Sequence, residues 1–144
     1  KANEPKVYEN NTAIVKAAAA GEIDVGFVNH YYLFRQLAEQ GQSFGARNYY
    51  PKNGDPGALI NVAGAGILNT AKNQEAATQF VRFLLSQEAQ QYFTDETYEY
   101  PLVEGSETNT ALPALSEIQT PNLDLSKLED LQGTLQLLQD VGIL

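Results

Sequence analysis

The sequence predicts an α/β fold in which helices alternate with short, buried strands. Residues 11–20 have a helical pattern, residues 23–29 form an apolar stretch rich in β-branched side chains, and residues 31–41 return to helical spacing. A helix, a strand and a helix in this order are typical of layered α/β proteins. The alternation repeats where an apolar segment, residues 58–68, is followed by an amphipathic helix that starts after Asn73.

The first two helices are delimited by the residues at their ends. Asn10 and Asn11 are good N-cap residues, and Gly21 ends the first helical run. The buried strand expected over residues 23–29 leads directly into the second helix, which ends at Gly41. The junction between a strand and the next helix is where open α/β sheets tend to bind ligands.

The middle of the chain combines strand and turn signals. Residues 44–51 are expected to form a strand, and residues 52–57 contain the Asn, Gly, Asp and Pro typical of a turn. Residues 58–68 are apolar, with Gly64 and Gly66 inside the run. Since glycine weakens or bends a strand, this segment is expected to be one bent strand or two short ones.

The second half of the chain is expected to be mainly helical. A short helix should cover residues 88–93, a strand fragment should lie near residues 98–102, and Ser126 should cap a last amphipathic helix. The helix after Asn73 should bury the apolar face formed by Ala76, Ala77, Phe80, Val81, Leu84 and Leu85.

Composition excludes several classes of function. Nine Lys and Arg against eighteen Asp and Glu give the 144 residues a net charge of −9, whereas a nucleic-acid-binding protein needs a basic face. There is no Cys, and His30 is the only histidine, so disulfide frameworks, thiolate zinc sites and His-rich metal centres are excluded. The sequence contains no Met, and we expect it to be a mature, trimmed or excised piece.

The most unusual chemistry lies at the start of the second helix, where Asn29, His30, Tyr31 and Tyr32 are consecutive. Free backbone N–H groups and the positive end of the helix dipole favour negative charge there. A free tyrosine has a pKa of about 10, so a phenolate at neutral pH needs strong help, which a trivalent metal supplies. Phenolate is a hard oxygen ligand and suits Fe³⁺ better than Zn²⁺ or Cu⁺.

Packing is the competing interpretation of these residues. Adjacent tyrosines usually place one ring in the core and the other at the surface. Tyr49 and Tyr50 form a second such pair, which we interpret as packing because it follows an expected strand and precedes Pro51. His30 alone is more often a hydrogen-bonded structural histidine than a ligand. A hydrolase built on His30 and a serine is disfavoured, because no Gly-x-Ser-x-Gly motif occurs.

Several stretches occur in an order and at spacings that are specific. They are Asn10-Asn11, GEIDVGFVNHYYLFR, GDPGALINVAGAGILN, KNQEAATQFVRFLLSQEAQ and YEYPL. Together they resemble the C-terminal part of periplasmic ferric-ion-binding proteins, the substrate-binding components of iron(III) ABC transporters. The resemblance extends from about Val7 to the final DVGIL.

The resemblance implies a periplasmic-binding-protein-like fold (type II, two-lobed), of which this chain is the C-terminal portion. It implies that Tyr31 and Tyr32 are ligands to Fe³⁺ in the intact protein. It implies that Asn11 and Asn29 hold a synergistic anion or support the ligands. Whether an anion is used stays open, because Asn-His-Tyr-Tyr resembles the branch of the family that needs none. No ligand role is implied for His30.

The resemblance also implies how the chain is divided and what it works with. Residues 1–60 belong to the second lobe and include the tyrosine junction, residues 61–112 form a hinge strand and return to the first lobe, and residues 113–144 form a helical tail packed on the second lobe. The implied partners are an ABC permease and either the missing N-terminal half of the chain or a swapped second copy, a dimer. The implied protein is bacterial, not an enzyme, and periplasmic or anchored at the cell surface.

Two other functions remain open at this point. A binding protein of the same fold could carry a polyamine or an oxyanion. A polyamine site uses several carboxylates with aromatic walls, whereas the junction at Tyr31 offers phenols and amides. A structural or interaction domain with packing tyrosines is the other alternative.

Overall fold

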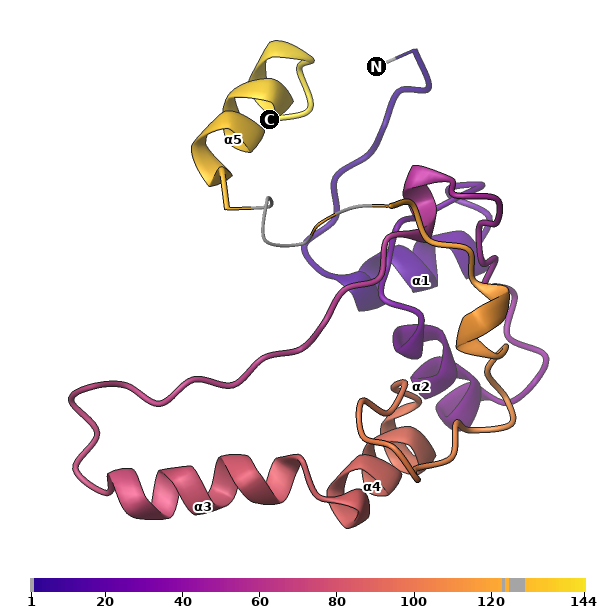
Figure 1. Cartoon of the computed structure of the whole chain (residues 1–144). Coiled ribbons are helices and arrows are strands. Elements are labelled where there is room, and N and C mark those ends of the chain that lie inside the picture. The colour runs from indigo at the N-terminus through magenta and orange to yellow at the C-terminus, as the bar shows by residue number, and fades with distance from the viewer. Residues whose placement is uncertain (1, 123, 125–128) are drawn as a thin grey trace.

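The computed structural model describes residues 2–122, 124 and 129–144, and in these residues all regular structure is helical. The elements are α1 (Asn11–Ala19), α2 (Tyr31–Gln40), the 3₁₀ turn η1 (Pro56–Ala58), α3 (Gln74–Leu84), α4 (Gln87–Thr97), the 3₁₀ turn η2 (Leu115–Glu117) and α5 (Leu131–Asp140). Figure 1 shows α1, α2 and α4 gathered on one side, α3 reaching away from them as an arm, and α5 standing apart. Among the described helices, none combines the length and apolarity needed to cross a bilayer.

The ends of the first two helices are as predicted. The Asn10 side chain accepts a hydrogen bond of 2.9 Å from the backbone N–H of Ala13, which satisfies one free donor at the start of α1. Gly21 and Gly41, which follow α1 and α2, have φ angles of +72° and +83°. Glycine adopts this left-handed region without strain, so both glycines end their helices for the expected reason.

A small hydrophobic core lies between α1 and α2. Val15 of α1, Leu33 of α2 and Phe44 from the segment after α2 are buried and form its centre. The residues packed around them are Ala19, Val28, Tyr32, Leu37 and Ala46. One of the two adjacent tyrosines, Tyr32, therefore helps to seal the core that positions α2.

The predicted strands are wrong for the residues that the structure describes. Residues 23–29, 44–51, 58–68 and 98–102 contain no strand. A strand exists only where its N–H and C=O groups pair with a neighbour, and these segments form no such ladder with one another. The segment 23–29 is not buried either, because Val25 and Phe27 lie in it with 78% and 84% of their surface exposed.

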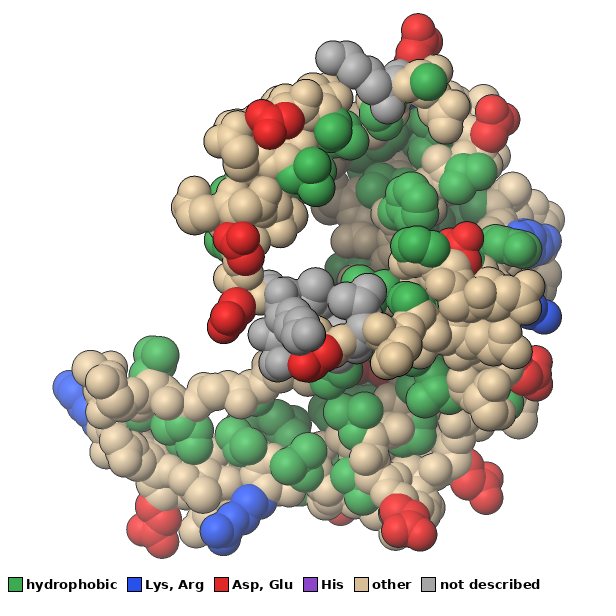
Figure 2. Space-filling view, turned by 45° about the horizontal axis from the view of Figure 1, so that its top comes forward, with side chains coloured by type: hydrophobic (Ala, Val, Ile, Leu, Met, Phe, Trp, Pro, Cys, Tyr) green, Lys and Arg blue, Asp and Glu red, His purple; other side chains and the backbone are tan. Residues whose placement is uncertain are grey.

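Helix α3 forms where predicted, but its predicted buried face is wrong. None of its residues is buried, and Phe80 is 61% exposed. The apolar side of α3 instead lines an open groove with the segment before it, as Figure 2 illustrates with the hydrophobic side chains along this arm. The groove residues include Ile67, Leu68, Phe80, Val81 and Leu84.

The remaining elements agree in type with the sequence prediction and differ in extent. Helix α4 is longer than the predicted 88–93, and Ser86 caps it by accepting a hydrogen bond of 3.2 Å from the Ala89 N–H. In the predicted turn, Asn53 and Gly54 have positive φ angles. Helix α5 has Asp130 as its N-cap, whereas the predicted cap, Ser126, lies outside the described residues.

Candidate metal centre

The two adjacent tyrosines occupy the first turn of α2. Tyr31 is the first residue of the helix, and the Tyr32 N–H already bonds to the Asn29 carbonyl at 3.2 Å. Their rings lie side by side, with centroids 4.8 Å apart and planes inclined by 30°. Both side chains are half-buried. The structure therefore places two phenol groups next to each other at a helix N-terminus, where negative charge is favoured.

The two predicted asparagines lie at the same place. The Asn29 amide donates to the Tyr31 hydroxyl at 3.3 Å. The backbone N–H of Asn29 donates to the side-chain oxygen of Asn11 at 3.0 Å. Asn11, at the start of α1, thereby fixes the residue that holds Tyr31, and all four predicted site residues are brought together.

Arg35 is a member of the site that the sequence reasoning missed. Its guanidinium carbon lies 5.6 Å from the centroid of the Tyr31 ring and 5.4 Å from that of Tyr32. Helical residues three and four positions apart face each other, so the spacing from Tyr31 and Tyr32 was the available signal. A cation over both rings is an attractive contact and orients the pair.

The surroundings of Tyr31 favour its neutral phenol in the protein alone. Partial burial is the main cause that raises the pKa of Tyr31 above 10, and the neighbouring Tyr32 raises it further, while the hydrogen bond from Asn29 lowers it. The helix terminus does not by itself make a phenolate. A strongly charged cation between the two oxygens is what would displace their protons.

His30 is built into the surrounding structure as an anchor. Its Nε2 lies 2.6 Å from the carbonyl oxygen of Tyr98, and since a carbonyl only accepts, Nε2 carries the proton. Burial lowers the pKa of His30, although the hydrogen bond to Tyr98 opposes this. This hydrogen bond supports the interpretation of His30 as a structural histidine rather than a metal ligand.

The second tyrosine pair does not form a comparable site. Tyr50 is half-buried, with its ring centroid 6.3 Å from that of His30, and it packs as expected. Tyr49 is 84% exposed, so the packing interpretation is wrong for it.

The donors at the junction are phenol and amide oxygens. Within the described residues, no group of three or more His, Cys, Asp or Glu side chains is placed to hold a metal ion. The tyrosine pair is therefore the best candidate for a hard, highly charged cation in this part of the chain.

Known proteins resemble this chain in sequence and in structure. An Fe(3+)-binding periplasmic protein of Serratia marcescens is 31% identical over 139 residues, which are 95% of this chain and 41% of that protein. Iron uptake protein A1 of Synechocystis sp. is 34% identical over 124 residues, 83% of this chain and 34% of that protein. The crystal structure of iron-bound HitA from Pseudomonas aeruginosa superposes with a TM-score of 0.86 and 36% identity, covering 95% of this chain and 44% of HitA.

The superposition confirms the predicted periplasmic-binding-protein-like fold, of which this chain reproduces a part. This chain spans less than half the length of the relatives and of the solved structure that it matches. Residues 1–120 also match the family model described as bacterial extracellular solute-binding protein. Such proteins bind solutes and are not enzymes, as predicted, and an extracytoplasmic bacterial location agrees with this match. The chain belongs to the family of bacterial extracellular solute-binding proteins.

Proposed function

We propose that this chain is part of an extracytoplasmic protein that captures Fe³⁺ through the phenolates of Tyr31 and Tyr32 and delivers it to an ABC permease. The main observation in support is the contact between the two tyrosine rings at the start of α2, together with the hydrogen bond from Asn29 to Tyr31. The names of the similar proteins, which refer to Fe(3+) binding and iron uptake, support the choice of cargo.

Binding of the ion would proceed by exchange of protons for metal. Each tyrosine loses its phenol proton and becomes an anionic oxygen ligand, and the two negative charges offset most of the charge of Fe³⁺. Arg35, over both rings, and Asn29, at the Tyr31 hydroxyl, keep the two oxygens together before the ion arrives. This arrangement reduces the conformational entropy that is lost on binding.

We assign Asn11 and Asn29 to support of the ligands rather than to an anion. Asn11 accepts from the Asn29 backbone, and the Asn29 amide donates to Tyr31, so both side chains are engaged inside the site. A synergistic anion would have to displace these bonds. The site therefore needs no anion in order to hold Tyr31 in place.

Two phenolates do not complete the coordination of a ferric ion, so further donors must come from elsewhere. Since this chain spans 41% of the Serratia relative, we propose that a longer polypeptide supplies them from a facing lobe. In this proposal residues 1–60 and the tail 113–144 belong to one lobe, and residues 61–112 belong to the other. The exposed apolar side of α3 is covered either by the rest of that polypeptide or by a second copy of this chain.

The test uses the absorption spectrum of the iron-loaded longer protein. An Fe³⁺–phenolate pair gives a visible charge-transfer band, and Tyr31→Phe and Tyr32→Phe should each weaken iron binding severely and diminish the band. Tyr49→Phe is the matched control, because Tyr49 belongs to the other tyrosine pair and its side chain is 84% exposed. Retention of the band in Tyr31→Phe with its loss in Tyr49→Phe would contradict the assignment. A wild-type protein without any band would favour another cargo.

A further inference from the structure

We propose that His30 is a positioning residue, a latch that joins the tyrosine-bearing end of α2 to residues 98–100 and holds the two lobes together. The latch rests on the proposed function, because it takes residues 1–60 and 61–112 as parts of different lobes. Residues 30 and 98 are 68 positions apart in the chain, yet their contact is direct.

The latch is a hydrogen bond onto a residue with an unusual backbone. Tyr98 ends α4 in the left-handed conformation, with φ 59° and ψ 32°. This region is uncommon for residues other than glycine, and it costs energy that neighbouring contacts must offset. The bond from His30 Nε2 to the Tyr98 carbonyl, 2.6 Å long, is such a contact.

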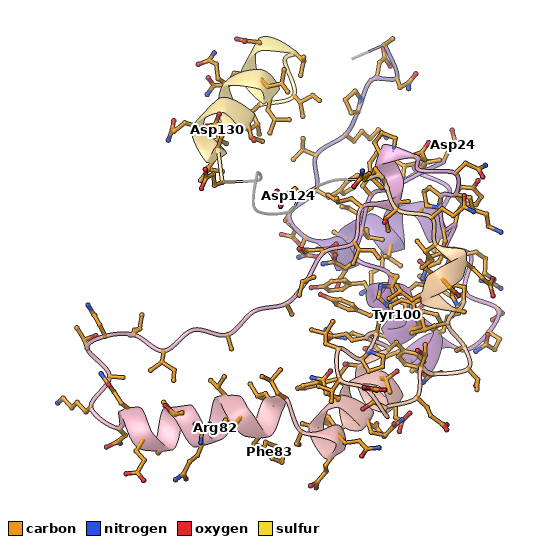
Figure 3. The ribbon with its side chains drawn as sticks, viewed as in Figure 1. Asp24, Arg82, Phe83, Tyr100, Asp124 and Asp130 are labelled. Carbon is orange, nitrogen blue, oxygen red and sulfur yellow. The ribbon has the colours of Figure 1, made fainter. Side chains whose placement is uncertain are left out.

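Aromatic rings on both sides complete the contact. One turn after His30, Phe34 stacks on the Tyr98 ring with centroids 4.5 Å apart and planes inclined by 9°. The Tyr100 ring lies 5.5 Å from the His30 ring, and its hydroxyl donates to the Pro113 carbonyl at 2.8 Å. Figure 3 labels Tyr100 where this segment runs past α2. His30 and Phe34 thus hold residues 98–100 from one face of α2.

His30 is also coupled directly to the metal site. It precedes Tyr31 in the chain, and its ring meets the Tyr31 ring edge to face at 5.6 Å. Its carbonyl oxygen accepts a hydrogen bond of 2.9 Å from the Asn48 amide, which fixes the peptide that leads into α2. A change in the position of His30 is therefore expected to change the position of Tyr31.

These contacts favour the arrangement in which residues 98–100 lie against α2. The bond forms only when residues 98–100 lie against α2, so it stabilises that arrangement over one in which the segments part. An ion held by Tyr31 and by donors of the facing lobe would favour the same arrangement. Capture of the ion and engagement of the latch therefore reinforce each other.

The absence of cysteine allows a direct test with two introduced labels. Ala38→Cys on α2 and Glu88→Cys on α4 are exposed positions, and spin labels there report the distance between the two helices. We expect one narrow distance distribution in the 144-residue chain. His30→Phe keeps a ring but removes the hydrogen-bond donor. We expect it to lower the ratio of chains with a short distance between the labels to chains with a long distance by roughly two- to tenfold.

Two further variants make the test specific. His30→Gln keeps an amide donor close to the position of Nε2 and should restore the narrow distribution, whereas Tyr49→Phe should leave it unchanged. Circular dichroism checks that each variant keeps its helices. A broad distribution in the wild type, an unchanged one in His30→Phe, or no rescue by His30→Gln would each overturn the latch.

The rate of iron release tests the role of the latch independently of the assignment of the iron ligands. In the longer protein, His30→Phe should speed iron release by roughly the same factor while the position of the charge-transfer band stays the same, because both phenolates remain. An unchanged release rate would overturn the role of the latch in holding iron. The distance measurement involves no iron, so a latch that is present without any iron band would mean that the proposed function alone has failed.

Discussion

Tyr100 is a tyrosine whose pKa lies well above its ordinary value. Burial, and then the nearby Tyr50 and Glu117, raise its pKa to about 12, against about 10 for a free tyrosine. Its hydroxyl donates to the Pro113 carbonyl, and a phenolate cannot make that bond. The neutral form is therefore the one that fits the folded chain.

This shift predicts a loss of stability in base. Because the folded pKa is higher than the unfolded one, the stabilisation by neutral Tyr100 is fully present below pH 10 and is lost as the pH rises towards 12. Urea unfolding at pH 9, 10 and 11 should show a falling midpoint. Tyr100→Phe should lower the midpoint at pH 9, because the Pro113 bond is lost, and should make it less dependent on pH. An equally steep pH dependence in the variant would disprove the assignment.

At this scale, the sequence identified the site residues through resemblance and position. Tyr31, Tyr32, Asn11 and Asn29 lie together in the structure, whereas the metal-ligand roles of the tyrosines are still predictions. The left-handed conformation of Tyr98 could not have been predicted from the sequence. The contact that accompanies it comes from His30, which is 68 positions away, and no local sequence signal indicates that contact.

At the scale of elements, the close approach of the segment after α2 to α1 depends on a glycine. A Cβ added at Gly45 would lie 2.5 Å from the backbone oxygen of Ala19, at the end of α1. Backbone cannot move aside as a flexible side chain can. We expect Gly45→Ala to lower the free energy of unfolding by about 1–3 kcal/mol, as overpacking commonly does.

Gly64→Ala is the matched control for this prediction. Among the described residues, no atom beyond Gly64 and its two chain neighbours lies within 4 Å of a Cβ built there, and the glycine lies in the segment before α3. Both variants are compared with the wild type by urea denaturation. Equal midpoints for Gly45→Ala and Gly64→Ala would show that the Ala19 contact does not limit the packing of this segment.

Helices were predictable and strands were not, for a physical reason. The caps of α1 and the glycines after α1 and α2 act within a few residues, so local sequence is enough to place them. A strand depends on a partner that is distant in sequence. Residues 23–29 and 58–68 have the composition of strands, but they meet no pairing partner in the part of the chain that the structure describes. The strands expected for an α/β fold form only where such pairing partners are present.

At the scale of the whole molecule, the arm formed by α3 and the segment before it exposes several large apolar side chains. Side chains of α3 and of the segment before it, among them Val62, Ile67 and Phe80, are exposed. Contiguous patches of this kind mark surfaces that another element covers. The net charge of −9 limits nonspecific aggregation, because like-charged chains repel one another.

We therefore predict that the 144-residue chain associates with itself through this arm when nothing else covers it. A dimer in which the arms of two copies pack against each other would bury the apolar face of α3, and it leaves the contact between His30 and Tyr98 within each copy. Sedimentation at micromolar concentration should give a dimer. Phe80→Ser should shift it towards monomer, because an exposed apolar side chain at the groove is lost. Gln79→Ser, at an exposed polar position of the same helix, is the control. A wild-type monomer at this concentration, or equal dissociation of both variants, would mean that the arm is not the contact surface.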